Sequence, residues 1–161
     1  MGLMIMCRNI LIVFFFTAMT VKAQVGSMNV DQITERLTKN NDTTFIINFW
    51  ATWCKPCVEE LPVFESITQK YPKGRIKVLL VSLDFKNKVQ SVLIPFVKKR
   101  NLQSEVIWLN EKNYDAIIDK IHPDWSGSLP ATLIVAPHNR IVFFKEGTID
   151  EQELHSHILT E

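Results

Sequence analysis

The sequence predicts an α/β domain in which a mixed sheet is covered by helices on both faces. Two nearly continuous apolar runs, residues 44–50 and 76–83, are typical of buried parallel strands. Segments with helical hydrophobic spacing follow each of these runs. Near the C-terminus, two short β-branched runs flank residues 137–139 and predict a hairpin. Because a hairpin adds antiparallel strands to the parallel ones, the sheet should be mixed.

Residues 1–23 have the layout of a secretory signal peptide. Arg8 closes a polar start, and the apolar run Ile10–Met19 is too short to span a bilayer comfortably. Ala23 offers a small residue at a cleavage site. The alternative is an N-terminal membrane anchor formed by residues 10–21.

We expect residues 24–161 to form one domain with its own hydrophobic core. They carry 16 lysines and arginines against 17 aspartates and glutamates, a net charge of −1. This balance gives no signal for nucleic-acid binding. The expected product is a monomer in the periplasm or another extracytoplasmic compartment, from which Cys7 has been removed.

The first half of the domain predicts a helix, a strand and a second helix. Apolar residues recur at helical spacing from Val30 to Leu37, with Asp31 expected to cap the helix or lie in its first turn. Residues 44–50 suit a buried strand. The second helix is expected at 57–70, bent at Pro62, which removes one backbone hydrogen bond.

The second half predicts alternating strands and helices that end in the hairpin. Pro95 is a weak point in the next helix, and Asp150 is the expected cap of the last one. The predicted elements are strands at 76–83, 106–109, 132–136 and 141–144, and helices at 89–100, 114–121 and 150–159.

After removal of Cys7, the domain retains only Cys54 and Cys57. A disulfide that closes so short a loop removes little entropy from the unfolded chain, so this pair is a poor stabiliser and a plausible redox couple. The two cysteines directly follow the strand at 44–50. They are therefore expected at the carboxyl end of a strand and the start of a helix, where open α/β sheets place their chemistry.

Thiol–disulfide exchange needs one exposed, partly ionised thiol and a second thiol that resolves the mixed disulfide. Cys54 lies nearer the helix start, where unpaired N–H groups favour a thiolate, so we expect it to be the nucleophile and Cys57 the resolving thiol. Pro56 falls in the first helical turn, where its missing N–H costs little. Lys55 adds a positive charge beside Cys54.

These residues carry a family resemblance. The segment Asn48-Phe49-Trp50-Ala51-Thr52-Trp53-Cys54-Lys55-Pro56-Cys57, followed by Glu59-Glu60-Leu61-Pro62, resembles the thioredoxin superfamily, and more closely its bacterial branch named for TlpA and ResA. Ser128-Leu129-Pro130-Ala131-Thr132 matches the second signature of the family, a cis proline before a strand. The resemblance covers most of residues 28–161. It implies a thioredoxin-like fold with an insertion before the cis-proline strand.

The resemblance also implies a substrate-binding face. A cis Pro130 would hold Leu129 beside Cys54 and leave the backbone of Leu129 free to pair with an extended substrate. Trp53 would shield the disulfide and form part of the docking surface. Trp125 is expected to cover the insertion, and the alternative is that it faces the substrate groove.

Asn48 stands where thioredoxin itself has a buried aspartate that accepts the proton of the resolving cysteine. Asparagine does agree with the TlpA and ResA branch, in which a glutamate three residues after the second cysteine is assigned acid/base work. That residue is Glu60 here. One turn beyond Cys57 on the same helix face, a partly buried Glu60 would have a raised pKa and relay the Cys57 proton. A solvated carboxylate is the alternative.

The resulting prediction is a protein disulfide reductase that uses no cofactor beyond its own disulfide. Relatives keep selected exported thiols reduced, including apocytochrome c haem sites, with electrons from a membrane reductase. The resemblance thus implies exported cysteine-containing proteins as substrates and a membrane electron donor. A disulfide oxidase or isomerase of the same fold is the first alternative, because direction depends on the reduction potential.

A Cys/His metallochaperone is a second alternative, and a binding module without activity is a third. His155 and His157 are separated by a single residue, which is short for a zinc site, and the four histidines are expected at the surface. No metal is therefore expected. Loss of activity usually removes a cysteine or the cis-proline signature, and both are present.

Overall fold

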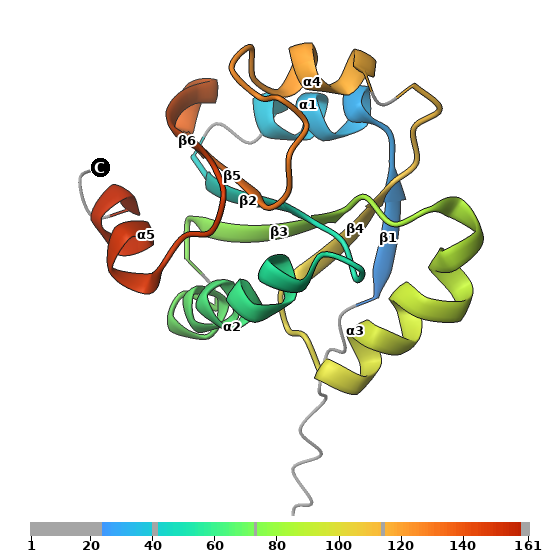
Figure 1. Cartoon of the computed structure of the whole chain (residues 1–161). Helices are drawn as coiled ribbons and strands as arrows, with labels where there is room; N and C mark the ends of the chain where they lie inside the picture. The colour runs from blue at the N-terminus through green and yellow to red at the C-terminus, as the bar shows by residue number, and fades with distance from the viewer. Residues whose placement is uncertain (1–23, 40–41, 73, 114, 159–161) are drawn as a thin grey trace, which may run out of the picture.

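The computed structural model describes residues 24–39, 42–72, 74–113 and 115–158, which form a mixed six-stranded sheet in the order β1-β4-β3-β2-β5-β6 (Figure 1). The first four strands of that order pair in parallel, whereas β5 runs antiparallel to β2 and β6 antiparallel to β5. The predicted mixed sheet is confirmed. The strands are β1 (Val25–Met28), β2 (Thr44–Trp50), β3 (Ile76–Ser82), β4 (Glu105–Leu109), β5 (Ala131–Ala136) and β6 (Arg140–Glu146).

Helices cover both faces of this sheet, as predicted. Figure 1 shows α1 (Val30–Lys39) and α4 (Asp115–Ile121) side by side on one face. The other face carries α2 (Lys55–Lys70), α3 (Ile94–Arg100) and α5 (Glu151–Ile158). The two faces bury separate apolar clusters, because alternate residues of each strand point to opposite sides.

Strand β2 lies in the middle of the sheet and ends at the cysteines. All seven of its residues are buried, including the polar residue Asn48. The predicted segments at 44–50, 76–83, 106–109 and the hairpin all form strands within two residues of their expected bounds. The carboxyl ends of β2 and β3 meet at the same edge, because these strands are parallel.

The start of the domain differs from the prediction. Strand β1 was not predicted, since Val25-Gly26-Ser27-Met28 has no run of β-branched residues and its pairing depends on β4, far along the chain. Asn29 caps α1: its Oδ1 accepts from the Gln32 N–H at 2.8 Å, while Gln32 Oε1 accepts from the Asn29 N–H at 2.9 Å. Asp31 therefore lies in the first turn instead of capping the helix.

The helix predicted at 89–100 is composite. A 3₁₀ turn at Lys86–Lys88 precedes a π-helical stretch at Val89–Leu93, and α3 follows with Pro95 in its first turn. Proline has no N–H to donate to the preceding turn, so the hydrogen-bond pattern changes where Pro95 enters. The predicted weak point is confirmed. By contrast, α2 continues through Pro62 without a break in its assigned span.

The C-terminal helix begins as predicted. Asp150 Oδ1 accepts from the Glu153 N–H at 2.8 Å and caps α5. The hairpin turn is a 3₁₀ turn in which His138 and Asn139 have positive φ angles of 64° and 59°. The proposed signal peptide or anchor at residues 1–23 lies outside the described residues. Within the described ranges, no helix has the length and hydropathy needed to cross a membrane.

Candidate active site

The two cysteines form a disulfide at the start of α2. Their Cα atoms are 5.3 Å apart, and Cys54 is the N-cap residue of the helix. Cys57 is fully buried, whereas Cys54 retains 6% exposure. Pro56 lies in the first turn, as predicted. The more exposed cysteine is thus at the helix N-terminus, where a thiolate is stabilised by unpaired N–H groups. The chemical roles of these residues stay predictions.

Lys55 faces solvent beside the disulfide. Its side chain is 86% exposed, and its Nζ lies 3.7 Å from Glu59 Oε1. An exposed pair of this kind is screened by water and salt, so the positive charge acts weakly on the cysteines.

A buried carboxylate that the sequence analysis missed holds the turn before Cys54. Asp84 is fully buried just after β3 and accepts from the Thr52 N–H at 3.0 Å, from the Thr52 hydroxyl, and from the Ser82 hydroxyl at 2.8 Å. Its backbone carbonyl also accepts from Trp108 Nε1 at 2.9 Å. The available signal was a polar residue at the carboxyl end of a parallel strand, where it meets the end of β2.

An apolar surface lies on one side of the disulfide. The rings of Trp53 and Phe85 stack with centroids 6.2 Å apart, and they are 58% and 61% exposed. The Leu129–Pro130 peptide bond is cis, as the resemblance implied. A cavity of about 390 Å³ joins these residues; its lining is Trp53, Leu83, Phe85, Gly127, Ser128 and Leu129. Phe85 is a second residue that sequence reasoning missed.

Trp125 is a buried side chain that supports the loop before the cis proline, residues 126–130. It is 3% exposed, packs on Phe49 with centroids 4.7 Å apart, and donates from Nε1 to the Ser128 carbonyl at 3.0 Å. Trp125 is buried and does not line the apolar cavity, so the alternative that it faces the groove is wrong, while its expected role as a cover over the insertion stays a prediction. The Ser126 N–H and hydroxyl both donate to the Glu146 carboxylate, which fastens the same loop to β6.

On the other side of the disulfide, Glu60 is buried one turn beyond Cys57. It is 6% exposed; Oε1 accepts from Asn48 Nδ2 at 2.8 Å and Oε2 from the Ile149 N–H at 3.0 Å. Burial raises the pKa of Glu60 above its usual value, while these two hydrogen bonds and the charge of Lys145 lower it in part. The buried carboxyl with a raised pKa is therefore confirmed, and the solvated alternative is wrong.

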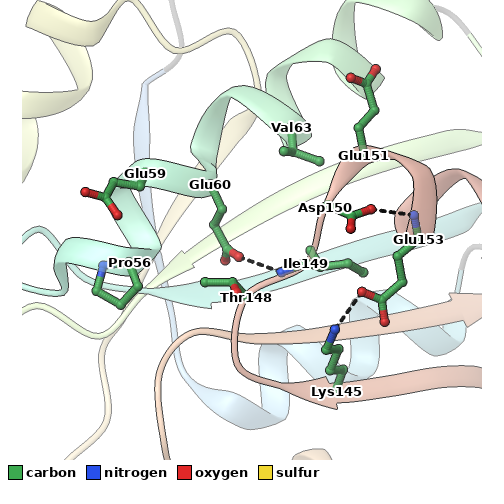
Figure 2. A pocket seen from close by; sticks show the side chains of 10 residues that line it. All are labelled: Pro56, Glu59, Glu60, Val63, Lys145, Thr148, Ile149, Asp150, Glu151 and Glu153. Carbon is green, nitrogen blue, oxygen red and sulfur yellow. Dashed lines mark hydrogen bonds and ion pairs between the residues drawn. The ribbon is translucent and has the colours of Figure 1, made fainter.

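The Glu60 carboxyl also lines a cavity of about 500 Å³ that is open to solvent (Figure 2). Figure 2 shows Glu60 pointing from α2 towards the backbone of Ile149, and Lys145 reaching from β6 to Glu153. The Lys145 and Glu153 side chains pair at 2.6 Å. This cavity shares no lining residue with the apolar one.

The histidines are distributed over the β6 side of the domain, and only His138 is exposed. His122 stacks on Phe144 and His157 on Phe143, with ring centroids 4.2 Å and 3.9 Å apart. The other three are partly covered but still reach the surface, so the prediction that all four lie at the surface is confirmed. In the part of the chain that the structure describes, no three His, Cys, Asp or Glu side chains are grouped to hold a metal ion.

Comparison with known proteins points to one family. The model of the AhpC/TSA family matches residues 11–144. The thiol-disulfide oxidoreductase ResA of Oceanobacillus iheyensis is 28% identical over 133 residues, which are 82% of this chain and 64% of ResA. The sporulation thiol-disulfide oxidoreductase A of Bacillus subtilis is 32% identical over 68 residues, 42% of this chain and 41% of that protein. The chain thus spans less than two thirds of the length of both curated relatives.

Among solved structures, StoA from Bacillus subtilis superposes with a TM-score of 0.59 at 23% identity, covering 73% of this chain and 84% of StoA. This likeness establishes the thioredoxin-like fold. Together, the matches agree with the fold and branch that the cysteine segment and the Pro130 signature indicated.

Proposed function

Because the chain belongs to the AhpC/TSA family, we propose that it is a thiol–disulfide oxidoreductase that reduces disulfides of partner proteins through Cys54 and Cys57. The observation that carries this proposal is the disulfide at the start of α2, with a buried carboxyl one turn further along the same helix. The relatives named thiol-disulfide oxidoreductases support the reaction class. The direction rests on the resemblance to the ResA branch.

The reaction balances with the two thiols as electron donors. In the reduced protein, the Cys54 thiolate attacks one substrate sulfur; an S–S bond forms between them, and the other substrate sulfur leaves as a thiolate. Cys57 then loses its proton and attacks Cys54 Sγ, which forms the Cys54–Cys57 disulfide and releases the second substrate thiolate. Two electrons pass to the substrate, and a reductant of the thiol class must restore the dithiol.

Glu60 is suited to accept the Cys57 proton. Cys57 is fully buried, so water cannot easily take its proton directly. A carboxyl whose pKa is raised by burial is a stronger base than an ordinary glutamate, which brings it closer to the working pH. Asn48 cannot accept this proton as an aspartate would. It instead orients Glu60 by donating from Nδ2 to Oε1.

Trp53, Leu129 and Phe85 form the proposed substrate-binding surface. Their cavity is mostly apolar, and exposed stacked aromatic rings contribute large contact area at low entropic cost. Leu129 presents its backbone beside Pro130, where an extended substrate segment can pair with it. The proposed substrates are exported proteins with a cysteine flanked by apolar residues. The proposed site of action is extracytoplasmic, with a membrane reductase as electron donor.

The decisive measurement is reduction of a protein disulfide by the reduced domain, with Cys54→Ser and Cys57→Ser as variants. We expect Cys54→Ser to abolish reduction and Cys57→Ser to accumulate a mixed disulfide with the substrate, because it can attack but cannot resolve. If Cys54→Ser reduced the substrate as fast as the wild type, the proposed function would be wrong.

The reduction potential against glutathione then tests the direction. A potential near that of thioredoxin, about −270 mV, is expected for a reductase. A potential near that of a strong oxidant, about −120 mV, would reverse the direction and favour the disulfide oxidase.

A further inference from the structure

A basic turn adjoins the apolar surface beside the disulfide. Residues 85–104, which connect β3 to β4, contain four lysines and one arginine but no aspartate or glutamate. Lys86 and Lys88 follow closely after Phe85, and the Lys88 N–H donates to the Phe85 carbonyl at 2.7 Å. Because this bond closes the 3₁₀ turn at Lys86–Lys88, the backbone of both lysines is held next to Phe85.

The two lysines of this turn are available to a partner. Lys86 and Lys88 are exposed, and neither side chain forms an ion pair with another residue in the described part of the chain. Lys55, two positions after Trp53, is also exposed and lies 3.7 Å from Glu59 Oε1. Each of the two stacked rings thus has an exposed cation close to it in the chain.

Two carboxylates close to this surface are already bonded within the protein. Asp84, which precedes the basic turn, is fully buried and accepts from the Thr52 N–H, the Thr52 hydroxyl and the Ser82 hydroxyl. Glu146 accepts from the N–H and hydroxyl of Ser126, at the start of the loop before the cis proline. These donors offset the negative charges locally. The ammonium groups of the basic turn have no such internal partner.

The charge has the opposite sign on the other side of the disulfide. The solvent-open cavity there is lined by five carboxylates and one lysine: Glu59, Glu60, Asp150, Glu151, Glu153 and Lys145 (Figure 2). That lysine is itself paired with Glu153 at 2.6 Å. A negatively charged segment is therefore repelled from this side and attracted to the basic turn, so the charges favour one kind of segment and one side of the disulfide.

We propose that the substrates are exported protein segments in which acidic residues lie near an apolar residue and the disulfide-bonded cysteine, and that Lys86 and Lys88 bind those carboxylates. The inference rests on the proposed thiol–disulfide exchange and narrows its substrate class. The apolar side chain of the segment enters the cavity of about 390 Å³ that Trp53, Phe85 and Leu129 line.

The spacing of the rings sets where the acidic residues belong. The ring centroids of Trp53 and Phe85 are 6.2 Å apart. An extended chain rises about 3.3 Å per residue, so it passes both rings within about two residues. The basic turn comes directly after Phe85. We therefore expect the carboxylates about two to four positions from the reacting cysteine.

The first test compares three peptides as substrates of the reduced wild type. They share one sequence and one intramolecular disulfide, with leucine beside one cysteine and either glutamate, glutamine or lysine at the two positions beyond that leucine. In about 0.1 M salt, kcat/KM should be highest for the glutamate peptide and lowest for the lysine peptide, by about two- to fivefold per charge. In about 1 M salt, most of the difference should disappear, because exposed charges are screened.

The second test reverses the charge of the basic turn. The double variant Lys86→Glu, Lys88→Glu should prefer the lysine peptide, and Lys86→Gln, Lys88→Gln should show little preference. The matched control is Lys98→Glu, Lys99→Glu, at the end of α3, which should keep the preference of the wild type. These lysines lie about 15 Å further along the helical segment, at 1.5 Å per residue, beyond the screening length of about 10 Å. Reduction of hydroxyethyl disulfide, which is small and uncharged, reports any damage to the cysteine chemistry in each variant.

Three results would overturn the proposal. The first is an equal kcat/KM for the glutamate and lysine peptides in the wild type, and the second is a glutamate preference that survives charge reversal at Lys86 and Lys88. The third is binding to phosphatidylglycerol vesicles that depends on these lysines without any peptide preference, which would assign the basic turn to a lipid surface. In all three cases the proposed function stands while peptide reduction requires Cys54. Failure of the function itself would appear as reduction that survives Cys54→Ser.

Discussion

Glu60 is a largely buried acidic side chain, and this burial is the main reason that its pKa is raised. Asn48 and the Ile149 N–H partly offset this by donating to the two carboxylate oxygens. These two donors hold the carboxylate in one position. A carboxyl poised in this way serves proton transfer better than one fixed permanently in its ionised form.

This burial predicts a pH dependence of stability. Above pH 4.5, the usual pKa of glutamate, the unfolded chain releases the Glu60 proton while the folded protein still holds it. The free energy of unfolding of the oxidised protein should therefore fall as the pH rises from there through the raised pKa. Urea unfolding across this range should show a smaller fall for Glu60→Gln. Equal falls in both proteins would contradict the burial argument.

Asp84 acts on the active site through the backbone. Replacing it with alanine removes the acceptor of two buried donors: the Thr52 N–H, in the turn that precedes Cys54, and the Ser82 hydroxyl at the end of β3. We expect Asp84→Ala to lower the free energy of unfolding by about 1–3 kcal/mol, the typical penalty for unpaired buried donors. Asp119→Asn, at an exposed position of α4, is the control in denaturant unfolding and should have little effect.

At the scale of elements, α5 and the segment before it form one wall of the Glu60 cavity. Ile149 donates to Glu60, and Asp150 caps the helix in the next position. The cap therefore fixes the backbone donor that bonds the carboxyl. Two consecutive residues, Ile149 and Asp150, thus connect the start of α5 to the Glu60 carboxyl.

Loss of this cap should be measurable. Asp150→Ala is expected to lower the free energy of unfolding by about 1 kcal/mol, because the Glu153 N–H loses its acceptor. Asp150→Asn retains a side-chain acceptor and should recover most of the loss. Thermal or urea unfolding of the three proteins checks this, and an unstable Asp150→Asn variant would show that charge instead of capping is responsible.

The elements that the sequence predicted are those whose signal is local. Strands β2 and β3 follow from continuous apolar runs, and α5 from its capping residue, because these patterns depend on neighbours in the chain. Strand β1 is stabilised by pairing with β4, a contact between distant segments that no local pattern reports. The π-helical stretch before α3 was foreseen only as a weakness at Pro95.

The residues of the candidate site also fall into a group that local sequence predicts and a group that depends on tertiary structure. The cysteines, Glu60 and Pro130 belong to contiguous motifs, so their placement was predictable. Asp84 and Phe85 reach the site because β3 lies beside β2 in the sheet, and this register is a tertiary property. Burial of Glu60 was left open because it depends on the segment around Ile149, 89 positions away in the chain.

For the whole molecule, the disulfide lies between two openings of opposite character. One is apolar and exposes Trp53 and Phe85; the other is lined largely by carboxylates and contains Glu60 and Lys145. Under the proposed function, protein contact would fall on the apolar side and the acid/base carboxyl on the other. The two openings share no lining residue.

Phe85→Ala should reveal this separation. We expect it to raise the KM for a protein disulfide several-fold and to leave reduction of a small-molecule disulfide unchanged, because only an extended substrate covers the stacked rings. Ile141→Ala removes another exposed apolar side chain from β6 and serves as the control. Steady-state kinetics with both substrates measures the difference; an equal loss for the small disulfide would place Phe85 in the chemistry instead.

The position of Glu60 on α2 has a consequence for protein engineering. The proposed nucleophile, the proposed resolving thiol and the buried carboxyl all lie within residues 54–60, so a short insert contains all three side chains. The groups that bond the carboxyl, Asn48 and Ile149, come from separate parts of the chain. A graft of this insert onto a foreign scaffold would transfer the two cysteines and the carboxyl but not the hydrogen bonds that set the pKa of Glu60. A designer would have to rebuild those bonds in the recipient.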